Sequence, residues 1–487
     1  MTPAHPAFEN TFARDLPDMF EPWEAVVVEN PELLVLDDEL ALELGFDPQW
    51  LRSPDGVRFL IGNHRLEGMQ PIAQGYAGHQ FGGFSPRLGD GRALLLGEVI
   101  DTNGQRRDIH LKGSGRTRYS RGGDGKAAVG PMLREYVIGG AMRALGIPTT
   151  RALAVVATGE RIPRDEMLPG AVLCRVASSH LRVGSFQYAA TMSHDHIARL
   201  ADHAIARHYP ELIGEPDRHL ALFHAVMNRQ AKLVAQWMGV GFIHGVMNTD
   251  NMTISGETID YGPCAFLDTH DPTTVFSSID HQGRYAYQMQ PRIVEWNCYA
   301  LGQAMVPLIG DVDTVKDALA VFQPTFEKKI AALWRAKLGM VSARDDDDAL
   351  VRELLTLMAK GRVDFPVFFR RLSSLRREDP SADEPLRNLF IDRAGFDAWL
   401  VKYRARLEVE QSIDAARKIA MDQVNPKFVL RNHLAQIAIQ KAQQKDFSEV
   451  QRLLHILQRP FDEQPEYESY AALPPDWAAG ISVSCSS

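Results

Sequence analysis

A short set of polar residues near the middle of the chain constrains its fold more than any other feature. His244 and Asn251 stand at the ends of the segment HGVMNTDN, and the tripeptide Asp-Tyr-Gly follows at 260–262. Asn251 and Asp260 are oxygen donors, and an apolar strand with a glycine turn at 252–256 would bring both to one hard cation such as Mg²⁺ or Mn²⁺. Taken alone, the same stretch also fits a hairpin with polar residues placed by chance.

The spacing matches the catalytic loop of protein kinases, H-x-D-x-x-x-x-N, and their metal-binding D-x-G, with one position changed. Val246 occupies the place of the catalytic aspartate, and a valine cannot accept a proton. A carboxylate is present instead at Asp250, beside Asn251. Asp250 is therefore the candidate proton acceptor, although an aspartate in this context is also a common turn residue. The pattern indicates altered chemistry on a kinase-like frame.

Strand patterns dominate the first part of the chain after an irregular entry with short helices, for example at 32–44. The sequence Gly-Asp-Gly-Arg at 89–92 predicts a tight turn, and the glycine- and arginine-rich segment 113–125 predicts a loop. The predicted strands are 93–100, 107–112, 152–158 and 171–176.

Helical periodicity dominates the rest of the chain. The predicted helices are 132–145, 194–208, 218–238, 291–308, 313–338, 347–360, 395–424 and 428–458. Strands first and helices afterwards indicate an α+β class, and with the motif loop a protein-kinase-like fold of two lobes. The expected regions are an N-terminal extension packing on the lobes (1–75), a β-rich nucleotide-binding N-lobe (76–190), a helical C-lobe with additional C-terminal helices (191–460) and a flexible tail (461–487).

Charged residues in the predicted N-lobe are candidates for phosphate binding. Lys112 ends a strand and Glu135 lies on the following helix, as in the ion pair with which kinases aim a lysine at phosphates. Arg175 and Arg182 have the side chain best suited to bidentate phosphate contact. Alternatively, Lys112 and Glu135 are two unrelated surface charges, and Arg175 and Arg182 are two surface arginines.

Two glycine-containing turns are further candidates for the nucleotide pocket. Backbone N–H groups in the turn at 89–92 could approach an anion, and Asp124-Gly125 closes the loop that could fold over a nucleotide. An ordinary hairpin turn and a solvated basic loop explain the same residues.

Bulk composition excludes several classes of protein. The net charge of −9 gives no basic footprint for nucleic acid. The sequence has no apolar run of membrane-spanning length and no secretory signal, so no membrane partner and a cytoplasmic monomer are expected. Its four cysteines are too few for a disulfide framework.

Several long and unusual strings resemble the selenoprotein O family, which includes the bacterial YdiU proteins, across nearly the whole length. They are YAGHQFG at 76–82, LGDGR at 88–92, HLKGSG at 110–115, NTDN at 248–251 and IDYGP at 259–263. The resemblance implies a pseudokinase fold that binds ATP in a flipped orientation. It also implies transfer of AMP to protein Ser, Thr or Tyr hydroxyls, with release of pyrophosphate.

The resemblance implies a role for each candidate residue. Asp250 would accept the proton, and Asn251 and Asp260 would bind Mg²⁺ or Mn²⁺. The remaining residues would form the ATP pocket, with Glu135 orienting Lys112; they are Gly89, Gly91, Arg92, Lys112, Asp124, Gly125, Glu135, Arg175, Arg182 and Asp260. The rival functions are a kinase-like phosphotransferase and an inactive ATP-binding regulator.

The tail Cys485-Ser486-Ser487 resembles the place where animal members carry selenocysteine. Our hypothesis is a regulatory disulfide from Cys485, with Cys264 as the candidate partner. A free tail thiol is the alternative.

Overall fold

A computed structural model describes residues 5–164, 166–481 and 483. Within them, the first part of the chain forms an eight-stranded antiparallel sheet of order β1-β3-β6-β7-β10-β9-β2, with β8 paired to β10. The strands are β1 (Phe20–Pro22), β2 (Glu32–Leu36), β3 (Ile72–Gln74), β6 (Ala93–Ile100), β7 (Arg106–Lys112), β8 (Ala127–Ala128), β9 (Arg151–Pro163) and β10 (Met167–Ala177). The predicted combination of helices with an antiparallel sheet is confirmed.

Alternate side chains of the central strands enter two different cores. Leu95 of β6 and Leu173 of β10 join the largest apolar cluster, together with helix α5 (Val129–Ala144). Leu94 and Cys174, their neighbours in sequence, join a second cluster on the opposite face with the N-terminal helices. Because successive side chains of a strand point to opposite faces, a strand covered on both sides is apolar throughout.

The segment before residue 75 belongs to the sheet, since β1, β2 and β3 all come from it. The short helix predicted at 32–44 is wrong in its first half, where β2 pairs with β9. Asp37 marks the change of structure because its side chain accepts a hydrogen bond from Leu40 N and caps α2. The helices here are α1 (Thr11–Asp15), α2 (Asp38–Glu43), α3 (Pro48–Leu51) and α4 (Pro54–Phe59).

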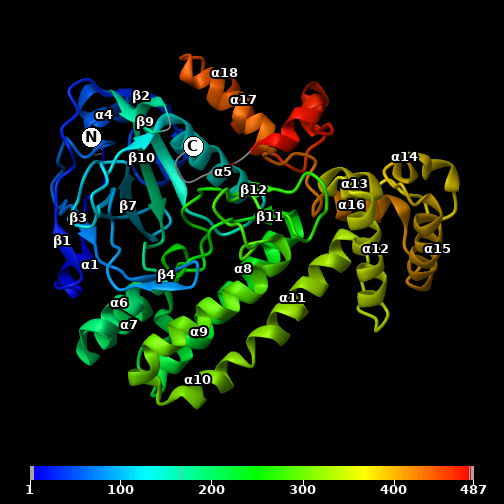
Figure 1. The fold of residues 1–487 in the computed structure, drawn as a ribbon, viewed down its shortest axis with the longest axis horizontal. Coiled ribbons are helices and arrows are strands. Elements are labelled where there is room, and N and C mark those ends of the chain that lie inside the picture. Colours follow the sequence, from blue (N-terminus) through cyan, green and yellow to red (C-terminus); the bar gives the residue numbers. More distant parts are fainter. Residues whose placement is uncertain (1–4, 165, 482, 484–487) are drawn as a thin grey trace.

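The later helices lie beside and below the sheet in Figure 1, and a group from α12 to α16 extends away from it. They are α6 (Val183–Met192), α7 (His194–His208), α8 (Arg218–Val240), α9 (Gln290–Ile309), α10 (Val312–Leu319), α11 (Phe322–Lys337), α12 (Asp347–Gly361), α13 (Phe365–Leu372), α14 (Glu384–Arg387), α15 (Arg393–Val409), α16 (Asp414–Asp422), α17 (Asn432–Gln443) and α18 (Ser448–Leu457). In the described part of the chain, none of them is both long and apolar enough to cross a bilayer.

Three helices predicted as continuous are each broken in two, and α6 and α13 were not predicted. The predicted 313–338, 395–424 and 428–458 become α10 and α11, α15 and α16, and α17 and α18. The breaks let α10 pack on α9 and α11 on α8, and let α15 pack on α12 and α16 on α11, whereas α17 and α18 both pack on α5, as Figure 1 also shows. Periodicity alone does not report such a change of direction.

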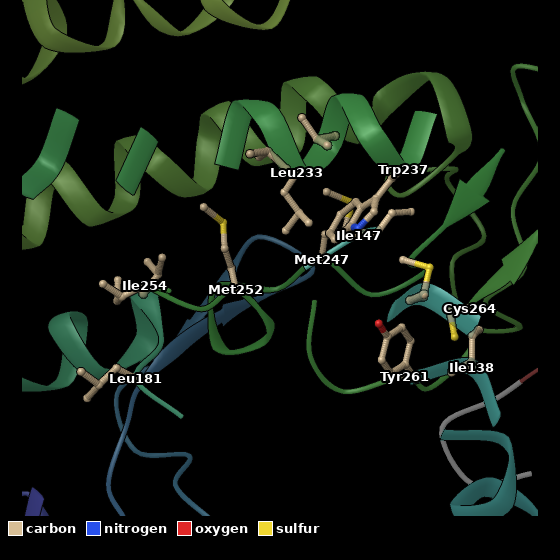
Figure 2. Close-up of a cluster of buried hydrophobic side chains, with 14 of the residues drawn as sticks. Ile138, Ile147, Leu181, Leu233, Trp237, Met247, Met252, Ile254, Tyr261 and Cys264 are labelled. Carbon is tan, nitrogen blue, oxygen red and sulfur yellow. The ribbon is translucent and has the colours of Figure 1, made fainter. Parts of the chain in front are cut away.

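The motif segment is held in place by its apolar side chains. Figure 2 shows Met247, Met252 and Tyr261 in a buried cluster with Trp237 of α8. The strand predicted at 252–254 is wrong, because this stretch makes only an isolated bridge between Thr253 and Arg182. The regular strands nearby are β11 (Phe242–Ile243) and β12 (Ala265–Phe266), which pair antiparallel.

The residues expected to form a flexible tail pack on the body as far as the structure describes them. They form 3₁₀ turns at Pro465–Ala471 and Asp476–Gly480, and Lys427 pairs with both Glu463 and Glu468. Val483 bridges to Ser277, on the loop before α9. Cys485 lies outside the described residues, and Cys264 is buried.

Lys337, at the end of α11, is a buried lysine with 2% of its surface exposed. Its ammonium donates to Asn425 Oδ1 at 2.8 Å and lies 4.2 Å from the centroid of the Phe369 ring. Burial lowers the pKa of Lys337 from 10.5 to about 7.

We predict that Lys337→Met stabilises the protein at pH 7 and removes a pH dependence. Between pH 7 and 10.5 the unfolded chain binds more protons at this lysine than the folded chain, so wild-type stability rises with pH across that window. Relative to the variant, the wild-type free energy of unfolding should increase by about 1–3 kcal/mol from about pH 7 to about pH 9.5. Urea unfolding at the two pH values measures this change.

The matched control is Lys328→Met, at an exposed position of the same helix. It should leave the pH dependence of wild type unchanged. If the free energies of unfolding of wild type and Lys337→Met differ by the same amount at both pH values, the prediction is wrong.

Candidate active site

A cleft of about 490 Å³ lies between the sheet, the loop 113–125, α5 and the motif segment, a volume typical of small-molecule sites. The structure brings every residue predicted for the site to this cleft. They are Gly89, Gly91, Arg92, Lys112, Asp124, Gly125, Glu135, Arg175, Arg182, Asp250, Asn251 and Asp260.

The Asp260 carboxylate is the centre of charge in the cleft. Its Oδ1 accepts hydrogen bonds from Lys112 Nζ at 3.0 Å and from Arg175 at 2.6 Å, and its Oδ2 accepts one from Arg182 at 2.6 Å. Lys112 also donates to Glu135 Oε2 at 2.6 Å. Although burial opposes its charged form, the cations Arg175, Lys112 and Arg182 hold the pKa of Asp260 well below its usual range.

Strand register explains how Lys112 and Arg175 come together. In the pairing of β7 with β10, Lys112 stands opposite Leu173, and Arg175 is two residues farther along β10. Residues two apart share a face of the sheet, and Leu173 packs in the same core as α5, which carries Glu135. Asp260 reaches this group from the motif segment with a φ of +58°, a left-handed conformation that is uncommon for a residue with a side chain.

Two further polar residues, which the sequence did not predict for the site, hold Arg175 through a chain of hydrogen bonds. They are His110 and Asp90. Arg175 Nε donates to His110 Nδ1 at 3.3 Å, so His110 Nε2 carries the proton and donates to Asp90 Oδ2 at 3.3 Å. Burial lowers the pKa of His110, which keeps the ring neutral. Both residues lie within the strings quoted above, but only the β7–β10 pairing, which sets His110 opposite Arg175, brings them to this arginine.

His244 supports the D-x-G turn from a buried position and is not among the residues that line the cleft. Its Nε2 bonds to the carbonyl of Ile259 at 2.9 Å, which fixes the residue before Asp260. Asn251 donates its amide to the carbonyl of Val246 at 3.0 Å. That bond uses the nitrogen of Asn251 and leaves its side-chain oxygen for a ligand.

Asp250 is buried, with 8% of its surface exposed, and has one carboxylate oxygen without a partner. Its Oδ2 accepts a hydrogen bond from Gln80 Nε2 at 3.1 Å, whereas Oδ1 has no hydrogen-bond partner among the described residues. Burial raises the pKa of Asp250 to about 6. A buried oxygen without a hydrogen bond costs free energy. Its presence beside the cleft is consistent with a carboxylate that takes a proton from a substrate.

The segment 76–82 holds the motif loop from the other side. The backbone N–H of His79 donates to Thr249 Oγ1 at 2.7 Å, and that of Phe81 donates to Asn248 Oδ1 at 3.2 Å. A Cβ on Gly78 would lie 2.7 Å from Asp250 Oδ1, so only glycine allows this approach. The sequence marked this segment only as part of a resemblance, and the structure gives it a contact with the candidate base.

The loop 113–125 closes one side of the cleft through ion pairs and close packing. Asp124 pairs with Arg164 at 2.8 Å and accepts from Lys126 N at 3.0 Å, so its carboxylate holds the loop. Gly89, with a φ of +71°, packs against Tyr119 so closely that a Cβ would lie 2.2 Å from the ring. Tyr76 is a further cleft residue that the sequence did not single out, and its ring lies 4.7 Å from the Arg182 guanidinium.

The side chains of Asn251 and Asp260 fit a hard divalent cation. Both line the cleft and offer oxygen atoms, which are the ligands that Mg²⁺ prefers. Two protein oxygens are a typical share for such an ion, because phosphates and water take the other positions.

Comparison with known proteins agrees with the motifs. The model of the family described as protein adenylyltransferase SelO matches residues 4–458. The chain belongs to the SelO family. The predicted family and the predicted class of enzyme, a nucleotidyltransferase, are thereby confirmed.

Bacterial members of the SelO family match over nearly their whole length. The protein nucleotidyltransferase YdiU of Mycobacterium sp. (strain KMS) is 54% identical over 477 residues, covering 96% of this chain and 97% of the relative. That of Methylorubrum populi is 52% identical over 491 residues, covering 98% of each. That of Bradyrhizobium diazoefficiens is 52% identical over 478 residues, covering 96% and 97%.

We predict that Asp260→Asn lowers the free energy of unfolding by about 3–5 kcal/mol, because it leaves three cations around one remaining carboxylate. Inorganic pyrophosphate should restore more stability to the variant than it adds to wild type, since an anion then replaces the missing charge. Thermal unfolding with and without pyrophosphate measures both effects.

Asp18→Asn is the control, because that carboxylate is 59% exposed and its pairs lie at the surface. It should change stability by less than about 1 kcal/mol. An Asp260→Asn variant as stable as this control would disprove the central role of the carboxylate.

Proposed function

We propose that this protein transfers AMP from ATP to Ser, Thr or Tyr hydroxyls of other proteins, releases pyrophosphate, and does so on a two-lobed, kinase-like fold. The observation that carries the proposal is the position of the base. Asp250, and not residue 246, supplies a carboxylate to a cleft in which three cations surround Asp260. Membership of the SelO family agrees with this chemistry.

The two-lobed fold is supported by where the cleft lies. One side of the cleft is formed by β7, β10 and α5, which carry Lys112, Arg175 and Glu135. The other side is the motif segment, which is anchored to the helical part of the chain through α8. A nucleotide held between a sheet and a helical region is the arrangement of a kinase-like enzyme.

In the transfer step, the acceptor hydroxyl oxygen attacks the α-phosphorus of ATP and its proton passes to the Asp250 carboxylate. The bond from the α-phosphorus to the bridging oxygen breaks, and pyrophosphate leaves with the electron pair. Negative charge on the leaving group is stabilised by Lys112, Arg175 and Arg182. In this structure, Asp260 forms ion pairs with all three of these cations.

The phosphates and Asp260 therefore compete for the same cations. When phosphates take over Lys112, Arg175 and Arg182, the Asp260 carboxylate is released for a cation. Mg²⁺ or Mn²⁺ bound by Asn251 and Asp260 would supply Lewis acidity to the phosphate oxygens. Glu135 bonds to Lys112 independently of Asp260 and so would hold the ammonium in place during this exchange.

The decisive test uses ATP labelled on the α-phosphate or on the γ-phosphate, incubated with the protein, divalent cation and a cell extract. We predict protein labelling only from the α position. Asp250→Asn should lower the rate about 100-fold or more while ATP binding stays within about threefold, because the substitution removes the base and keeps its shape.

Asp313→Asn is the control, since that carboxylate is 83% exposed on α10. Labelling only from the γ position would make the protein a kinase. ATP binding without any labelled protein would make it an ATP-binding regulator.

Removal of divalent cations gives a second test. We predict that EDTA abolishes labelling from α-labelled ATP and that Mg²⁺ or Mn²⁺ restores it. Asn251→Ala should raise the cation concentration needed for half-maximal labelling by about tenfold or more, because one of two protein oxygens is lost. Labelling that persists in EDTA would disprove the role assigned to the cation.

A further inference from the structure

The hairpin that holds Asp250 presents an aromatic surface next to the cleft. The hairpin consists of β4 (Gly78–Gln80) and β5 (Gly83–Ser85), and it lies between the sheet and the helices α6 and α9 in Figure 1. Its last β4 residue, Gln80, lines the cleft and bonds to Asp250. The next residue, Phe81, is 38% exposed, and Phe84 is 47% exposed.

Phe81 occupies a backbone position that suits a different residue. Gln80 pairs with Gly83, so Phe81 and Gly82 form the two-residue turn, with φ of +51° and +87°. A turn with two positive φ values favours Asn or Asp followed by Gly, and a bulky side chain there is strained. An exposed phenylalanine kept at such a position indicates a use for its ring outside the hairpin.

Arg284, close to the turn, is a cation that lacks a carboxylate partner among the described residues. Its guanidinium carbon lies 5.1 Å from the ring centroid of Trp296 and 5.7 Å from that of Tyr285. Its Nε is buried without a hydrogen bond in the described structure. The Asp280 carboxylate accepts the backbone N–H groups of 284 and 285 instead.

These side chains form one continuous surface beside the base. The Phe81 ring contacts the Tyr285 ring at 5.1 Å between centroids, and His79 contacts both Phe84 and Trp296, at 4.8 and 5.0 Å. Tyr285 also donates its hydroxyl to Asn248 Oδ1 at 2.6 Å, which ties the surface to the motif loop. We name the surface formed by Phe81, Phe84, Arg284 and Trp296 the acceptor patch.

We propose that the acceptor patch binds the protein segment whose hydroxyl receives AMP, and that this segment carries an acidic side chain near the hydroxyl. A guanidinium placed over aromatic rings keeps its N–H groups available at the edge for a carboxylate. The exposed rings of Phe81 and Phe84 supply apolar contact to the same segment. The inference rests on the proposed AMP transfer, since the patch is linked to the candidate base through Gln80, the neighbour of Phe81.

Random copolymers provide acceptors that differ only in charge. Transfer from α-labelled ATP is measured at saturating ATP with a copolymer of Glu, Ala and Tyr and with one of Lys, Ala and Tyr. We expect wild type to label the Glu copolymer with a kcat/KM about tenfold higher. Arg284→Glu should reverse this preference, whereas Arg352→Glu, the same charge change at an exposed position of α12, should keep it.

Phe81→Asn separates recognition from folding. Asparagine suits the first position of the turn, so the variant should be at least as stable to heat as wild type. We expect its KM for the Glu copolymer to rise about fivefold, with the KM for ATP unchanged. A merely structural role for Phe81 would give the opposite result, with unchanged acceptor KM.

The outcomes distinguish the two proposals. No α-label on either copolymer or on extract proteins would overturn AMP transfer and, with it, the acceptor patch. Either of two results would overturn the acidic acceptor alone. In the first, extract proteins are labelled but neither copolymer is. In the second, wild type and Arg284→Glu each label both copolymers equally.

Discussion

The structure of the cleft depends on one carboxylate surrounded by three cations. Lys112, Arg175 and Arg182 come from different parts of the sheet region and would repel one another without Asp260. Asp260 reaches them with a strained backbone, and Glu135 balances part of the remaining charge. Because burial makes an unpaired charge costly, this cluster fixes the motif segment against the sheet.

The same cluster explains how the cleft is prepared for a nucleotide. Its cations are already desolvated and oriented by His110, Asp90 and Glu135, so phosphates would meet a site that needs little rearrangement. In the proposed mechanism, nucleotide binding exchanges one set of ion pairs for another. The candidate base is linked to these cations through its backbone carbonyl, which accepts a hydrogen bond from Arg182 at 2.8 Å, while its carboxylate is held by Gln80 of the hairpin.

Sequence patterns predicted the central strands of the sheet better than the motif segment and the later helices. The strand 93–100 is correct at both ends because two covered faces make it apolar at every position except Glu98. The helix pairs from α10 to α18 were merged because both partners share the same periodicity, and only their packing separates them. The strand at 252–254 failed for a related reason: its apolar residues pack under α8 and do not pair with a neighbouring strand.

Asp124 shows that residue type alone does not identify the partner of a side chain within the site. Its place in the loop was predictable from the sequence, but its carboxylate pairs with Arg164, which no spacing rule connects to it. Gln80, Tyr76 and His110 were missed because an amide, a phenol and a buried imidazole have many uses. Their positions follow from contacts between residues distant in sequence, such as those of Gln80 with Asp250, Tyr76 with Arg182 and His110 with Arg175.

By itself, the sequence determined the chemistry: the displaced carboxylate at 250, the oxygen donors at 251 and 260, and the basic residues that suit phosphates. These follow from residue type and short spacing, which local geometry preserves. Only the tertiary structure decided that one aspartate pairs with three cations and that an aromatic hairpin holds the candidate base. Such contacts join segments far apart along the chain, and their distances are set by packing rather than by any local pattern.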